Sequence, residues 1–65
     1  MKIILNGKPA EVNAVRLDRL LVELGFAEAV VATALNEDFV SKDERAAIEV
    51  RAGDRLEIVA PLKGG

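Results

Sequence analysis

Hydrophobic and polar residues alternate near both ends of the chain, with the period of two that is typical of a half-buried β-strand. The pattern predicts one strand over residues 1–6 and another over residues 55–60. Because alternate side chains of a strand point to opposite faces, each strand has one apolar face that needs covering. These faces carry Met1, Ile3 and Leu5 in the first strand, and Leu56, Ile58 and Ala60 in the last.

A period close to 3.6 marks residues 16–24 as an amphipathic helix. Leucines occupy positions i, i+3, i+4 and i+7 of this stretch, so they form one stripe along the helix. Gly25 follows where a residue in the left-handed conformation can end the helix. The stripe consists of Leu17, Leu20, Leu21 and Leu24, with Asp18, Arg19 and Glu23 on the polar face.

Turn residues divide the rest of the chain into short strands. Asn6-Gly7 is the sequence of a type I′ turn, so residues 9–13 are expected to return antiparallel to the first strand. Pro9 has no N–H to donate, which suits the outermost strand of a sheet.

Residues 30–35 predict a third strand, although their alanines leave a helix open as the alternative. A turn and a short strand, Phe39-Val40, follow, and residues 41–47 have room for a helical turn. Glu37-Asp38 offers two adjacent carboxylates, but without histidine or a third ligand nearby we interpret the pair as a solvated turn.

The order of elements, β-β-α-β-β-β, predicts an α+β fold with one mixed sheet and the helix packed across one face. The first and last strands would form its central parallel pair, joined by a right-handed crossover. This is the β-grasp, or ubiquitin-like, topology. We expect a β-grasp domain over residues 1–61 and a flexible Gly-Gly tail over residues 62–65.

One face of the predicted sheet is left without a helix. If the alternation holds, four apolar side chains point outward there and form a small patch on which a partner could dock. The alternative is that these are scattered surface aliphatics, which are common on soluble proteins. The four residues are Ile4, Ala32, Ala34 and Val59.

Composition excludes several classes of function. The 65 residues carry a net charge of −2 without a basic patch, which argues against binding to nucleic acid. Cysteine and histidine are absent, which removes the usual nucleophile, general base and metal ligands. No apolar stretch approaches the ~20 residues of a membrane span, so a cytoplasmic protein is expected.

The last five residues carry the candidate chemistry. Pro61 ends the final strand, and Leu62 and Lys63 lead to Gly64 and Gly65. Glycine has no Cβ, so such a tail can enter a narrow slot in a partner and present its ionised carboxylate.

With these elements in place, the sequence resembles the ThiS family of sulfur carriers in thiamine biosynthesis. The similarity covers nearly the whole chain, and a Gly-Asp pair before the last strand with a Gly-Gly end makes it specific. It departs from the family at Ser41, where proline is frequent, and at Lys63, where a small or uncharged residue is commoner. The shared segments are Ile4-Leu5-Asn6-Gly7, Leu20-Leu21-Val22-Glu23-Leu24, Val31-Ala32-Thr33-Ala34-Leu35-Asn36, Phe39-Val40, Gly53-Asp54-Arg55-Leu56-Glu57-Ile58, Pro61 and Gly64-Gly65.

The resemblance implies a carrier and not an enzyme. A ThiF-like adenylyltransferase would use Mg-ATP to adenylate the carboxylate of Gly65, and a sulfur donor would convert it to a thiocarboxylate. A ThiG-like thiazole synthase would then receive the sulfur. Because its tail is passed between two enzymes, such a carrier is expected to be monomeric when free. Residues 61–64 would be recognised as the tail, and the chain itself would bind no metal or cofactor.

Five alternatives remain. Three are related: the small subunit of molybdopterin synthase, a sulfur carrier of another pathway, and a protein-conjugating tag. Residues 16–25 also resemble the first helix of S4-type RNA-binding domains, but residues 28–33 lack the basic side chains of the second helix. The last alternative is a plain β-grasp interaction domain.

Overall fold

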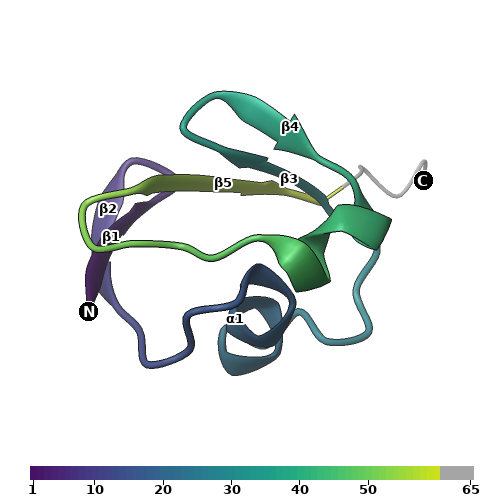
Figure 1. Cartoon of the computed structure of the whole chain (residues 1–65), viewed down its shortest axis with the longest axis horizontal. Helices are drawn as coiled ribbons and strands as arrows, with labels where there is room; N and C mark the ends of the chain where they lie inside the picture. Colours follow the sequence, from purple (N-terminus) through teal and green to yellow (C-terminus); the bar gives the residue numbers. More distant parts are fainter. Residues whose placement is uncertain (61–65) are drawn as a thin grey trace.

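A five-stranded mixed sheet with one α-helix across a single face makes up the computed structural model, which describes residues 1–60 (Figure 1). The sheet order is β2-β1-β5-β3-β4. The strands are β1 (Lys2–Leu5), β2 (Lys8–Glu11), β3 (Ala32–Leu35), β4 (Asp38–Val40) and β5 (Arg55–Val59), and the helices are α1 (Leu17–Glu23) and the 3₁₀ helix η1 (Lys42–Ala47).

β5 is the central strand, parallel to β1 and antiparallel to β3. Hairpins flank it on both sides, β1–β2 on one and β3–β4 on the other. The predicted β-grasp topology is therefore confirmed, including the central parallel pair and the outer position of β2. The predicted boundary between domain and tail lies outside the described residues.

Both hairpins turn through residues with positive φ. Asn6 and Gly7 have φ of 49° and 83°, as the type I′ prediction requires. Asn36 and Glu37 have φ of 50° and 73° in the second hairpin. Asparagine tolerates this conformation well, whereas Glu37 adopts it without the freedom of glycine.

The core lies between α1 and the sheet face that it covers. The leucine stripe of α1 enters it as predicted, and Gly25 ends the helix with φ of 91°. Val12 and Val50 join it from the connections on either side. Its buried apolar residues are Ile3, Val12, Leu17, Leu20, Leu21, Val40, Val50, Leu56 and Ile58.

The third strand begins later than predicted, and the helical alternative for it is wrong. β3 starts at Ala32, which pairs with Val59, the last residue of β5. Val30 and Val31 therefore precede the paired part of the strand. The Val31 carbonyl accepts a hydrogen bond of 2.7 Å from Nη2 of Arg45 in η1.

The crossover from β4 to β5 passes through η1 and then beside the start of α1. Ser41 donates its main-chain N–H and its hydroxyl to Oε1 of Glu44, at 3.0 and 2.9 Å, at the beginning of η1. Leu17 N–H donates to the carbonyl of Ile48 at 2.9 Å, which ties α1 to this segment. Within residues 1–60, no helix is both long and apolar enough to cross a membrane.

Candidate functional site

Figure 1 shows that α1 covers one face of the sheet and leaves the other without a helix. Each of the four residues predicted to face outward is next to a buried residue of its strand, so the four share the face opposite α1. Ala32 lies directly across from Val59, and Ala34 lies two positions along the same strand. Ile4 lies beside the start of β5, and its neighbour Ile3 is buried under α1. Val59 is 62% exposed. The four residues thus lie on one face of the sheet, and their role in docking stays a prediction.

Phe39 belongs to the same face, which the sequence interpretation missed. It lies directly opposite Ala34 across the β3–β4 hairpin and is 70% exposed. Its neighbour Val40 is buried beside Thr33. The period of two, applied to Phe39-Val40, would have found it, because only one of two adjacent strand residues can enter the core.

We use the name open face for the apolar side chains of Ile4, Ala32, Ala34, Phe39 and Val59. Two charged residues of β5, Arg55 and Glu57, interrupt it, because they lie on the same side of the strand as Val59. Arg55 Nη2 lies 3.6 Å from Oε2 of Glu37, an exposed ion pair that adds little stability. A hollow of about 210 Å³ lies at this charged end, lined by Ile4, Gly7, Glu37, Arg55, Leu56 and Glu57.

The predicted tail residues, Pro61, Leu62, Lys63, Gly64 and Gly65, lie outside the described residues. The last described residue is Ala60, which follows Val59 at the end of β5. The tail is therefore joined to the domain at the Ala32–Val59 end of the open face.

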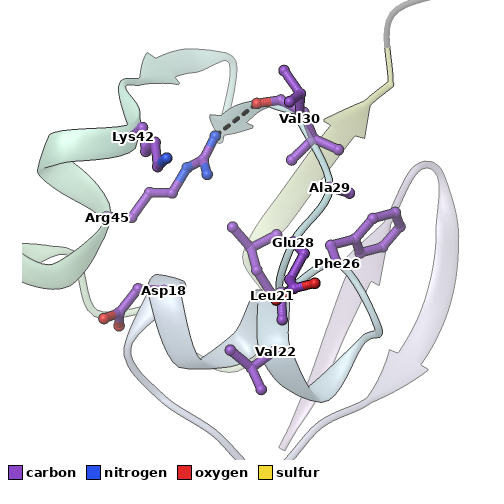
Figure 2. A pocket seen from close by; sticks show the side chains of 11 residues that line it. Asp18, Leu21, Val22, Phe26, Glu28, Ala29, Val30, Lys42 and Arg45 are labelled. Atoms are coloured by element: carbon purple, nitrogen blue, oxygen red, sulfur yellow. Dashed lines mark hydrogen bonds between the residues drawn. The ribbon is translucent and has the colours of Figure 1, made fainter.

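A larger hollow, of about 430 Å³, lies between α1, the α1–β3 loop and η1 (Figure 2). Arg45 crosses one side of it and bonds to the Val31 carbonyl, drawn as a dashed line in Figure 2. Its Nε also donates to Oγ1 of buried Thr33 at 3.2 Å, and that hydroxyl donates to the Val40 carbonyl at 2.8 Å. The guanidinium is thus engaged in holding β3, β4 and η1 together.

The described residues hold no cluster of three or more His, Cys, Asp or Glu side chains able to bind a metal ion. Three carboxylates have lowered pKa values, each because it accepts hydrogen bonds. The pKa of Asp18 is lowered mainly by the bond from Arg16, that of Glu23 by the main-chain N–H groups of Ala14 and Asn13, and that of Glu44 by Ser41. These carboxylates therefore stabilise connections and helix ends. The candidate functional features of residues 1–60 are the open face and the point at which the tail is attached.

The fold and this arrangement define a β-grasp domain that presents one apolar sheet face beside the origin of its C-terminal segment. The chain matches the model of the ThiS family over residues 3–65, and it belongs to that family.

Two solved structures resemble it along its whole length. The crystal structure of the thiamine biosynthesis protein ThiS from Geobacter metallireducens has a TM-score of 0.85 and 30% sequence identity, with both chains fully covered. A solution structure of a thiamine biosynthesis protein from the same organism has a TM-score of 0.82 and 29% identity, and 88% of that chain is covered.

Two curated relatives carry the name thiazole synthase. They come from Paramagnetospirillum magneticum and Magnetococcus marinus, and each is 39% identical to this chain over 66 aligned residues. All of this chain is covered in both cases, but it spans only 20% of each relative's length.

Proposed function

We propose that this chain is a sulfur carrier of thiamine biosynthesis, with its sulfur bound at the carboxyl carbon of Gly65. The observation that carries the proposal is the ThiS family match, which extends through Gly64 and Gly65. The whole-length likeness to a thiamine biosynthesis protein supports it.

In the proposed cycle, a ThiF-like adenylyltransferase joins the Gly65 carboxylate to the AMP part of Mg-ATP and releases pyrophosphate. The product is a mixed anhydride, in which AMP is a good leaving group. A sulfur donor then displaces AMP, and Gly65 becomes a thiocarboxylate. The chain acts as a co-substrate of these enzymes and binds no cofactor itself.

The proposed acceptor is a ThiG-like thiazole synthase. Support comes from the two relatives of that name, each of which contains a segment resembling this entire chain. Joining a carrier to its acceptor in one polypeptide raises their effective concentration, so such a fusion favours partners that work together.

The open face is the proposed docking surface for these partners. It adjoins the end of β5, so a partner that covers Phe39 and Val59 also meets the start of the tail. Fully burying an apolar side chain of this size contributes about 1.5–3 kcal/mol, which makes these two exposed residues the main apolar contacts available there.

Intact mass spectrometry with alkylation tests the proposal. The chain is incubated with the activating enzyme, Mg-ATP and sulfide, and is then treated with iodoacetamide. Exchange of oxygen for sulfur adds about 16 Da, the same nominal mass as oxidation of Met1, so the alkylation step is needed. Since the chain has no cysteine, the thiocarboxylate is the sulfur expected to be alkylated under mild conditions.

An adduct that depends on ATP and maps to Gly65 would support the carrier function. A chain lacking Gly65 serves as the control and should give no adduct. Absence of the adduct from the intact chain, with an enzyme competent on another carrier, would contradict the proposal. Reconstitution with thiazole synthase or molybdopterin synthase then identifies the acceptor.

A further inference from the structure

The side chain of Asn6 continues the pairing of β1 with β5 after the main chain of β1 has turned away. Ile4 N–H donates to the Asp54 carbonyl and Asn6 N–H donates to the Leu56 carbonyl, both at 2.9 Å. The next residue of β5 on this side is Ile58, but the chain enters the β1–β2 turn at Asn6.

The Asn6 carboxamide takes the place of the missing peptide group. Its Oδ1 accepts from Ile58 N–H at 2.8 Å, and its Nδ2 donates to the Ile58 carbonyl at 3.2 Å. A carboxamide has the same acceptor and donor as a peptide, so it can bond both main-chain groups of one strand residue at once. The turn geometry and this bond are linked, because positive φ at Asn6 directs the chain away while its side chain stays beside β5.

Ile58 is the third residue before Pro61, and its side chain is only 6% exposed. On the other side of β5, pairing with β3 reaches Val59. Within residues 1–60, the two hydrogen bonds of the Asn6 carboxamide are thus the last ones that join the β1 side of the sheet to β5.

We propose that Asn6 is a positioning residue for the carrier reaction: it fixes the end of β5 relative to the open face, and so fixes where the tail begins. The inference rests on the proposed function. When a partner binds the open face, the distance from that face to the start of the tail is constant only if the end of β5 stays paired in the sheet. Misplacing a reacting group by about 1 Å can reduce a rate by a factor of about 100.

Asn36 supplies a matched control within the same fold. It has φ of 50°, close to the 49° of Asn6, and it lies in the equivalent turn of the other hairpin. Its Oδ1 accepts from Arg55 N–H at 2.9 Å, so its side chain also bonds the main chain of β5. It does so at Arg55, the first residue of β5, which is three residues farther from the tail than Ile58.

The experiment compares Asn6→Gly with Asn36→Gly, because glycine accepts positive φ and only the side-chain bonds are removed. Amide hydrogen exchange by NMR is the first readout, and it does not depend on the carrier function. We expect Asn6→Gly to speed exchange at Ile58 by about tenfold or more, and Asn36→Gly to speed it at Arg55 instead.

The second readout is the rate at which the ThiF-like enzyme adenylates each variant, measured as the release of pyrophosphate. We expect Asn6→Gly to lower kcat by about tenfold with KM little changed, because the open face still docks. Asn36→Gly should keep the wild-type kcat. Asn6→Asp keeps the acceptor for Ile58 N–H but loses the donor, so its kcat should be intermediate.

Equal losses of kcat in the two glycine variants would overturn the positioning role, since general destabilisation would then explain both. Unchanged exchange at Ile58 in Asn6→Gly would overturn it as well. If the enzyme adenylates the wild-type chain and Asn6→Gly equally, the positioning role alone fails. If a competent enzyme does not adenylate even the wild-type chain, the proposed function fails and the positioning role falls with it.

Discussion

Phe39 lies directly opposite Ala34 across the β3–β4 hairpin, on the face of the sheet that α1 leaves uncovered. Alanine is too small to cover much of an aromatic ring, and Phe39 is 70% exposed. A large aromatic side chain held on a rigid strand is a frequent anchor of protein interfaces. Phe39 is therefore the residue of the open face whose substitution best tests whether partners dock there.

Replacing Phe39 with alanine should weaken partner binding while leaving the fold intact. We expect affinity for the activating enzyme to fall by about tenfold, or about 1.4 kcal/mol, because the buried aromatic contact is lost. Thermal stability should change little, since the ring is exposed in the free chain. Val22→Ala is the matched control, because Val22 is also exposed but lies on α1. Calorimetric affinities that fall equally for both variants would contradict docking on the open face.

Replacing Gly64 with valine should block activation without unfolding the domain. A branched Cβ narrows the backbone angles open to this residue and widens the tail, so the carboxylate of Gly65 cannot enter a slot shaped for glycine. Alkylation after incubation with enzyme, Mg-ATP and sulfide should yield almost no adduct, while circular dichroism stays unchanged. Lys8→Ala, on the outer strand β2, is the control and should still be labelled. Labelling of Gly64→Val at the wild-type rate would refute the tail's proposed role.

Local patterns in the sequence were sufficient for the strands, the helix stripe and the Asn6-Gly7 turn, because each depends on near neighbours. The start of β3 was not predictable in this way, since it depends on where β5 ends and on the bond from Arg45 to Val31. The same holds for the bond between Asn6 and Ile58, whose partners are 52 residues apart. Contacts of this kind depend on the tertiary arrangement, which cannot be inferred from a short stretch of sequence.

The outward group of residues was predictable because it follows from alternation once the helix-covered face is known. Phe39 obeys the same rule, and it was missed only because its strand has three residues and shows little pattern.

Substitution of Thr33 tests how much its hydrogen bonds contribute to holding η1 against the sheet. Its side chain is 1% exposed, and its hydroxyl both donates to the Val40 carbonyl and accepts from Arg45. Thr33→Val preserves the shape but removes the hydrogen bond to the Val40 carbonyl and the one from Nε of Arg45, which should cost about 1–3 kcal/mol in urea unfolding. Thr33→Ser keeps the hydroxyl and should lose only about 0.8 kcal/mol for the methyl group. Equal stability of Thr33→Val and wild type would contradict this structural role.

Glu23 makes part of the stability depend on pH. Its Oε1 accepts from Ala14 N–H at 2.8 Å, and its Oε2 accepts from Asn13 N–H at 2.9 Å, which holds the connection between β2 and α1 against the helix. These bonds favour the charged carboxylate, so the pKa of Glu23 in the folded chain is lowered from its ordinary value of 4.5. The unfolded chain therefore takes up the proton first as the pH falls.

The contribution of Glu23 is consequently complete above pH 4.5 and is lost as the pH falls through the lower folded pKa. We expect Glu23→Gln to have a lower urea midpoint than wild type at pH of about 6, and the difference to shrink at pH of about 3. Glu28→Gln, in the exposed loop after α1, is the control and should follow the wild-type curve. A difference between Glu23→Gln and wild type that stays constant over this range would mean that the lost bonds do not depend on the charge of the carboxylate.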